Sequence, residues 1–146
     1  MSLQSWQPEG WLRPHRVGPG EVTAILALAD RDLEQSQIPG LSADWQLGTA
    51  YNAALQCARA ALAACGYRVR RRPGQHYWTI RSLEFTIGLD AATVDVLDGF
   101  RRKRHAAEYE RPGCVSVGEA NQMLAMARTL RADVQAWLAA HHPALL

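Results

Sequence analysis

The residues best able to do chemistry gather between positions 101 and 109. This stretch holds four basic side chains, a histidine, a glutamate and a tyrosine: Arg101, Arg102, Lys103, Arg104, His105, Glu108 and Tyr109. Residues three and four apart share one face of a helix, so the group members at 101, 104, 105 and 108 fall on neighbouring ridges. Such a surface is a cationic pocket edge with titratable neighbours.

One helix has to position these groups, and the sequence predicts it from Asp90 to about Tyr109. Asp90 is a residue type that caps helix N-termini. An apolar stripe follows at spacings of three: Val94, Leu97 and Phe100. The Pro-Gly pair at 112–113 ends the helix. The charged end therefore projects from a buried stem.

Hydrophobic periodicity predicts four further helices. They run from Glu21 to the break at 38–40, from Ser42 to Gly66, from about Gln75 to Ile87 with Gly88 closing it, and from a Ser116–Glu119 capping box to His141. The second is rich in alanine, so neighbouring helices can approach it closely and we expect it to be central. No segment alternates with period two for long enough to form a strand. The predicted fold class is therefore all-α, an antiparallel bundle of about five helices in one domain, 21–142.

Residues 1–20 are expected to form an irregular arm. Three prolines and three glycines disfavour helix and strand there. Trp6 and Trp11 are unusual in a solvated segment, so we expect the arm to lie against the body or against a second subunit. More aromatic residues lie off the main stripes than a monomer of this size needs, which favours a homodimer: Trp6, Trp11, Trp78 and Phe85. We expect five residues in the core: Leu55, Leu62, Leu97, Phe100 and Leu130.

The length of 146 residues and the hydrophobic content of 48% suit one globular domain without metal or disulfide support. A net charge of +2 does not by itself indicate a nucleic-acid binder. Residues 59–111 nevertheless hold 11 of the 16 basic side chains and 6 of the 14 acidic ones. A functional basic surface and an arginine-rich composition throughout explain this distribution equally well. The basic run at 68–74 is interpreted as a solvated connection.

Metal and membrane sites are not expected from the sequence. The cysteines have no CxxC spacing, so we expect buried free thiols: Cys57, Cys65 and Cys114. His76 and the pair at 141–142 do not build a metal site by themselves, so no metal and no cofactor are predicted. No apolar run is long enough to span a membrane, and residues 1–8 lack the blocks of a signal peptide. We therefore expect a cytoplasmic protein with no membrane contact.

The order of these parts resembles the HEPN family over roughly residues 20–140. The similarities are an acidic first helix, an alanine-rich second helix with Asp44-Trp45 near its start and Tyr-Asn-Ala-Ala-Leu at 51–55, and a Gly-Gln-His opening at 74–76. The most telling piece is Arg-His-Ala-Ala-Glu-Tyr at 104–109. There the family has an Arg, a polar residue, three variable positions and a His. Tyr109 stands in the place of that His.

The resemblance implies a helical bundle that pairs into a homodimer and is associated with RNA or a nucleotide. Many such proteins are metal-independent ribonucleases of toxin–antitoxin or defence systems, often encoded beside a nucleotidyltransferase. By the same resemblance, the candidate catalytic residues are Arg104, His105 and Tyr109. The candidate residues for binding a ligand or its phosphate are Arg101, Arg102, Lys103 and Glu108. If the chain is an enzyme, we expect a metal-independent endoribonuclease.

Tyr109 changes what this site is expected to do. RNA cleavage needs a cation at the scissile phosphate, which Arg104 can supply, and groups that move protons near neutral pH. Histidine suits proton transfer because its ordinary pKa is about 6.5, whereas that of tyrosine is about 10. His105 is the alternative proton carrier, but it lies on a different bearing from Tyr109. We therefore expect binding without appreciable turnover at neutral pH.

Other interpretations of the same residues stay open. Arg104 and Glu108 have the spacing of a surface ion pair, and Tyr109 would then pack in the core near the helix end. The protein would otherwise be a non-catalytic interaction module or regulatory partner of a nucleotidyltransferase or antitoxin, whose cleft binds a nucleotide or a protein segment. A structural bundle without any ligand is the third possibility.

Overall fold

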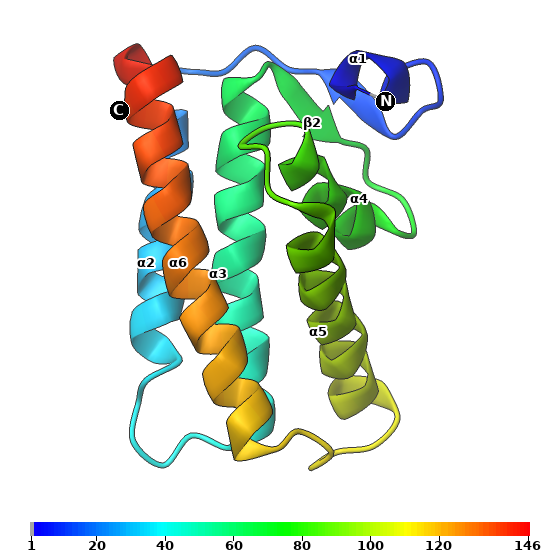
Figure 1. The fold of residues 1–146 in the computed structure, drawn as a ribbon, viewed down its shortest axis with the longest axis vertical. Coiled ribbons are helices and arrows are strands. Elements are labelled where there is room, and N and C mark those ends of the chain that lie inside the picture. The colour runs from blue at the N-terminus through cyan, green and yellow to red at the C-terminus, as the bar shows by residue number, and fades with distance from the viewer. Residues whose placement is uncertain (1) are drawn as a thin grey trace.

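The computed structural model describes residues 2–146 and is mostly helical (Figure 1). The long helices are α2 (Glu21–Gln35), α3 (Ala43–Ala64), α5 (Ala91–Tyr109) and α6 (Val117–His141). The shorter elements are α1 (Leu3–Trp6), β1 (Leu12–Pro14), β2 (Tyr67–Val69), α4 (Gln75–Arg81) and the 3-10 helices η1 (Ser82–Glu84) and η2 (Pro143–Leu145). The predicted all-α fold class is confirmed, because helices make up most of the described chain. The described chain has one α-helix more than expected, because α1 forms within the arm.

The long helices begin at the capping residues that the sequence predicts. The side chains of Ser42 and Asp90 each accept a hydrogen bond from the backbone N–H three residues later, both at 3.2 Å. Ser116 Oγ accepts from the Glu119 N–H at 3.0 Å, and Glu119 Oε1 accepts from the Ser116 N–H at 2.9 Å. These bonds satisfy N–H groups that the first helical turn leaves free. The predicted starts of α3, α5 and α6 are therefore confirmed.

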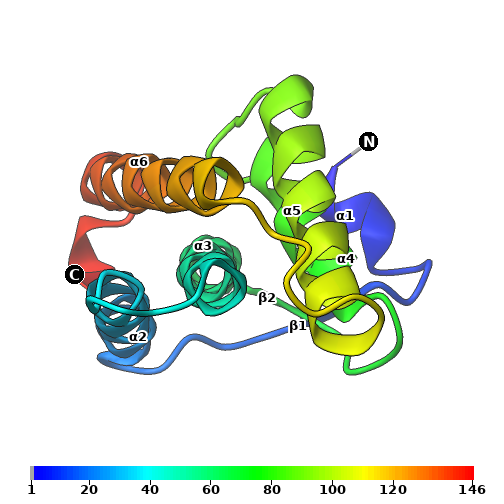
Figure 2. The ribbon, with the colours of Figure 1, turned by 90° about the horizontal axis from the view of Figure 1, so that it is seen from below.

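Helix α3 lies at the centre of the bundle, with α2, α5 and α6 around it (Figure 2). Its buried face consists mainly of alanines, whose short side chains let the neighbouring helices approach closely. The five predicted core residues are confirmed as buried: Leu55, Leu62, Leu97, Phe100 and Leu130. One stripe along α3 is not fully covered: Trp45, Thr49, Asn52, Gln56 and Arg59. We call these residues the open stripe of α3.

Two short strands connect the start of the chain to the segment after α3. β1 and β2 pair in antiparallel register, with Leu12 opposite Val69 and Pro14 opposite Tyr67. The predictions that the chain has no strand, that residues 1–20 are irregular throughout and that 68–74 is only a connection are therefore wrong. Strands of three residues are too short to show a period of two, and tertiary contact rather than local sequence stabilises their pairing.

The aromatic residues of the arm pack within the same chain. Trp6 meets Trp78 and Phe85 edge to face, with ring centroids 5.0 and 5.1 Å apart. Trp11 stacks on Trp78 at 4.2 Å. The buried aliphatic side chains of this cluster are Leu3, Leu12 and Leu62. The arm therefore lies against the body, as predicted, and the argument that these aromatics need a second subunit is wrong.

The third predicted helix ends earlier than expected. α4 stops at Arg81 and continues as η1, and Gly88 then turns the chain with a φ of 74°. The Ser82 hydroxyl donates to the Thr79 carbonyl at 2.6 Å, and the Thr79 hydroxyl donates to the Gln75 carbonyl at 2.7 Å. Hydroxyls that bond to the helix backbone in this way compete with the regular helix and bend it. The short α4 lies against α5, with its contacts running from Asp95 to Arg101.

Candidate functional site

Arg104 lies against the central helix. Its guanidinium carbon is 5.4 Å from the ring centroid of the buried Tyr51, and its Nε donates to Glu108 Oε1 at 3.0 Å. Gly48 also borders the guanidinium, since a Cβ built there would lie 3.8 Å from Arg104 Nε. The i,i+4 ion pair that the sequence allows is therefore present, and it lies beside the open stripe of α3.

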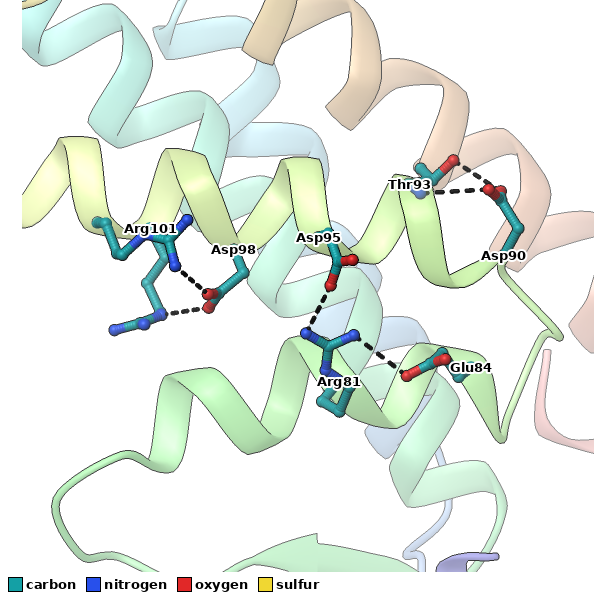
Figure 3. A network of polar contacts seen from close by, with 8 residues as sticks. Arg81, Glu84, Asp90, Thr93, Asp95, Asp98 and Arg101 are labelled. Carbon is teal, nitrogen blue, oxygen red and sulfur yellow. Dashed lines mark hydrogen bonds and ion pairs between the residues drawn. The ribbon is translucent and has the colours of Figure 1, made fainter. Parts of the chain in front are cut away.

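The other cations of this stretch are also paired with carboxylates. Arg101 Nε donates to Asp98 Oδ1 at 2.6 Å, and Arg102 Nη1 donates to Asp98 Oδ2 at 3.3 Å (Figure 3). Lys103 Nζ lies 3.4 Å from Glu119 Oε2 on α6. Partly exposed ion pairs contribute only about 0–1 kcal/mol each. An incoming phosphate can therefore replace the carboxylate beside Arg104 or Lys103 at small cost. Asp98 is only 6% exposed, so breaking its pairs with Arg101 and Arg102 would cost more.

His105 and Tyr109 lie at the end of α5 with their side chains exposed. Their ring centroids are 4.9 Å apart, with 43° between the ring planes. Tyr109 is 74% exposed, so the interpretation that it packs in the core is wrong. The helix ends at this residue. Two exposed rings beside a cation can stack with nucleic-acid bases.

Helix α4 is fixed against α5 by a network of arginines. The guanidinium carbons of Arg81 and Arg101 lie 5.5 and 5.7 Å from the ring centroid of Tyr77. Arg81 also donates to Asp95 at 2.9 Å and to Glu84 at 3.3 Å (Figure 3). Cation–π contacts and charged hydrogen bonds act together here. They hold the start of α4 next to the second half of α5.

His76, in the first turn of α4, belongs to the same surface. Partial burial lowers the pKa of its imidazole, the positive charges of Arg104 and Arg101 lower it further, and Glu108 acts in the opposite direction. The sequence does not predict that His76 lies near Arg104, because this proximity depends on how α4 packs on α5. Five residues thus form one surface, which we call the α5 surface: His76, Arg101, Arg104, His105 and Tyr109.

We expect His76 to titrate below its ordinary pKa of 6.5. Arg104→Gln removes a positive charge and should raise this pKa toward 6.5, whereas Glu108→Gln removes a negative charge and should lower it. The unfolded chain binds this proton more readily, so the contribution of His76 to stability is complete above pH 6.5 and falls as the pH drops through the lowered pKa. An NMR titration of the His76 ring measures the shifts, with Arg128→Gln on α6 as the control. If Arg104→Gln left the pKa of His76 unchanged, this would contradict the proximity of His76 to Arg104.

A cleft of about 880 Å³ lies between α2, the open stripe of α3, β2 and α4. Its ionisable lining residues are mainly basic: Arg59, Arg68, Arg71, Arg72, His15 and His76, with Glu21 as the acid. We call it the arginine cleft. His76 belongs to both the cleft and the α5 surface. Sequence reasoning missed this site, and the only signal for it was the basic run at 68–72.

The arginines of the cleft have no carboxylate partner among residues 2–146. Arg59 donates to the Gln56 side-chain oxygen. Arg72 donates to the Gly10 carbonyl at 2.9 Å and lies 4.6 Å from the ring centroid of Trp11. The positive charge of this cleft is therefore not neutralised within the chain, in contrast to that of the α5 surface.

These positive charges affect one another. Burial lowers the pKa of Arg59, and the charges of Arg68 and Arg71 lower it further, against the effect of Glu21. Glu21 Oε2 lies 2.7 Å from His15 Nε2. Burial raises the pKa of Glu21, but hydrogen bonds from His15 and from a backbone N–H lower it overall. The acid is thus already bonded, and an anion in the cleft would relieve the repulsion between the arginines.

Three further observations concern residues 2–146. No group of three or more His, Cys, Asp or Glu side chains is placed to hold a metal ion. The three cysteines are free thiols, as predicted; Cys57 is buried, whereas Cys65 and Cys114 are half-buried. No helix in this range combines the length and the apolar character that crossing a bilayer requires.

Comparison of the chain with protein-family models, with curated proteins and with solved structures finds no match. The connection to the HEPN family therefore depends on the order of the helices and on residues 104–109. It is carried forward as a proposal.

Proposed function

We propose that this chain is a HEPN-like domain that binds RNA on the α5 surface without appreciable turnover at neutral pH. The observation that carries the proposal is that the cations Arg101 and Arg104 act on His76, while the exposed rings of His105 and Tyr109 follow Arg101 at spacings of four along α5. These residues come from two helices and meet because α4 packs on α5. The arrangement offers cations and stacking faces at one place.

Phosphates and bases match different parts of the α5 surface. Arg101 and Arg104 present guanidinium groups, whose planar donors pair well with phosphate oxygens. His105 and Tyr109 present ring faces, and stacking contributes about 1–3 kcal/mol per base. Contacts to the RNA backbone release counterions, so the affinity should fall as the salt concentration rises.

The absence of turnover follows from the residue at 109. Attack by the RNA 2′-hydroxyl needs a base that is unprotonated near pH 7. A phenol gives up its proton less readily than an imidazolium ion, so Tyr109 is a weaker candidate for that base than a histidine. His105 lies next to it with an exposed ring, at 4.9 Å between the ring centroids, and His76 lies on the same surface, so imidazoles rather than the phenol are the alternative bases. We therefore propose binding as the function and keep cleavage as the outcome to be tested.

Arg104→Ala is expected to weaken the binding of a fluorescently labelled single-stranded RNA by about 10–100-fold. A hydrogen bond between charged groups contributes roughly 1.5–3 kcal/mol, and each 1.4 kcal/mol corresponds to a factor of ten. Tyr109→Phe should have a much smaller effect, because it keeps the ring and removes only a hydroxyl. Fluorescence anisotropy at several salt concentrations measures both affinities and the salt dependence.

Arg128→Ala is the matched control, because Arg128 is an exposed arginine on α6 outside the α5 surface and the arginine cleft. The RNA should stay intact in the presence of a chelator. Metal-free cleavage that both Arg104→Ala and Tyr109→Phe abolish would contradict the absence of turnover. An unchanged affinity in Arg104→Ala would contradict the location of the site.

The homodimer and the nucleotidyltransferase or antitoxin partner stay predictions. The aromatic cluster that favoured a dimer packs inside one chain, so it no longer supports a second subunit. Both predictions now depend on the family resemblance alone. RNA binding by the α5 surface of a single chain requires neither.

A further inference from the structure

We propose that the arginine cleft binds a nucleoside polyphosphate, at a site that shares only His76 with the α5 surface. The proposal does not require that the α5 surface binds RNA. It rests on unpaired cations, an apolar floor and side-chain amides that line one hollow of about 880 Å³. Small-molecule sites typically measure about 300–1,000 Å³. The hollow is therefore large enough for a base, a ribose and a chain of phosphates.

The cations fit a ligand that carries several phosphates. The four arginines of the cleft have no carboxylate partner among residues 2–146, and Glu21 already bonds to His15. A single phosphate would leave most of this charge unbalanced. A polyphosphate chain can contact several guanidinium groups at once and relieve their mutual repulsion.

One of the arginine side chains is held in place without a ligand, and a second arginine has a fixed backbone. Arg68 lies within β2, whose backbone pairs with β1. Arg72 is held by its hydrogen bond to the Gly10 carbonyl and by its contact with the Trp11 ring. Groups that are already ordered lose less entropy when a ligand binds. Arg71 is exposed and has no side-chain hydrogen bond or ion pair among the described residues, so it is free to close on a phosphate.

The rest of the lining fits a base. The apolar side chains of the cleft are Ile25, Leu55, Leu62, Ala63 and Val69. Asn52, Gln56 and Gln75 add amides, which donate and accept hydrogen bonds and match the edges of a base. Asn52 and Gln56 lie four residues apart on the open stripe of α3, so they face the cleft together. A polyphosphate without a base would contact neither the apolar side chains nor the amides of the cleft.

An RNA strand is the competing ligand for this cleft. Surfaces that bind single-stranded RNA follow its backbone with a track of cations and several aromatic platforms. In the arginine cleft, three of the arginines come from β2 and the β2–α4 connection, and Tyr67 is the only Phe, Tyr or Trp in the lining. One group of cations beside one apolar hollow favours a single nucleotide.

Isothermal titration calorimetry of the full chain with ATP, adenosine and inorganic tripolyphosphate tests the proposal. The titrations are run in EDTA, because the arginines are expected to supply the positive charge. ATP should bind more tightly than either adenosine or tripolyphosphate, since base and phosphates both contribute. Arg68→Ala and Arg71→Ala should each weaken ATP binding roughly tenfold or more. Thermal melting verifies that each variant is folded, and the exposed position of Arg71 makes its removal the safer of the two.

Three control variants separate the contributions. Arg128→Ala on α6 should leave the ATP affinity unchanged. Arg104→Ala should weaken RNA binding but leave ATP binding unchanged, so failure of one proposal is distinguishable from failure of the other. Asn52→Ala should weaken the binding of ATP and not that of tripolyphosphate, because its amide is expected to contact the base.

Three results would overturn the proposal. The first is equal affinity for ATP and tripolyphosphate, because the base would then contribute nothing. The second is ATP binding that both Arg68→Ala and Arg71→Ala leave unchanged. The third is binding of an RNA oligonucleotide that depends on these two arginines without measurable ATP binding, which would make the cleft part of an RNA surface.

Discussion

Replacing Trp6 by alanine is expected to lower the free energy of unfolding by about 3–5 kcal/mol. Trp6 is 1% exposed, and its ring meets Trp78 and Phe85 edge to face at 5.0 and 5.1 Å. Its indole N–H has no hydrogen-bond partner among the described residues, so the loss comes from packing and from the cavity left behind. Urea denaturation followed by circular dichroism measures the change.

Trp45→Ala is the matched control, because Trp45 is the same residue type but is 68% exposed on α3. It should change the free energy of unfolding by less than about 0.5 kcal/mol. Trp6→Ala should also weaken ATP binding, since Trp6 packs on Trp78 and Trp78 stacks with Trp11. Trp11 in turn lies beside the Arg72 guanidinium. Equal effects of the two substitutions on stability would contradict the packing of the arm.

The helix starts could be predicted because capping is local. Asp90 and Ser116 bond to backbone groups only three residues away, so residue type and spacing are enough to locate the ends. The core of α5 was predictable for the same reason, since the spacing of Leu97 and Phe100 alone defines its inner face. These features need no knowledge of the rest of the chain.

The strand pair and the arginine cleft could not be predicted, because both join distant parts of the chain. Leu12 pairs with Val69, and Arg72 reaches the carbonyl of Gly10, 62 positions earlier. The local sequence shows only an arm rich in proline and glycine and a basic run at 68–72. Neither pattern indicates that the two segments meet, so the local sequence predicts only a solvated connection at 68–74.

The candidate site was predictable in part. The Arg104–Glu108 pair follows from a spacing of four residues on one helix. The position of His76 near Arg104 depends on the packing of α4 against α5, which no local pattern describes. The exposure of Tyr109 likewise depends on where the neighbouring elements end. An amphipathic residue at a helix end suits either environment, so the sequence left both open.

Leu97→Ala is expected to lower the free energy of unfolding by about 2–5 kcal/mol. Leu97 is 1% exposed and lies in the main core, one turn before Phe100. Truncation removes apolar contacts and leaves a cavity. The same helix carries Arg101 and Arg104, so the packing of Leu97 also holds the α5 surface in place. Denaturant unfolding measures the loss, and amide hydrogen exchange along α5 locates it.

Val96→Ala is the matched control, because Val96 is the neighbouring residue on α5 but is 41% exposed. It should change the free energy of unfolding by less than about 0.5 kcal/mol. Leu97→Ala removes no charge. The folded molecules of this variant should therefore bind RNA more tightly than the Arg104→Ala variant does. We also expect Leu97→Ala to speed up amide hydrogen exchange along α5. A variant as stable as the original chain, with unchanged exchange, would contradict this prediction. Polar contacts such as Arg81–Asp95 would then hold α5 in place.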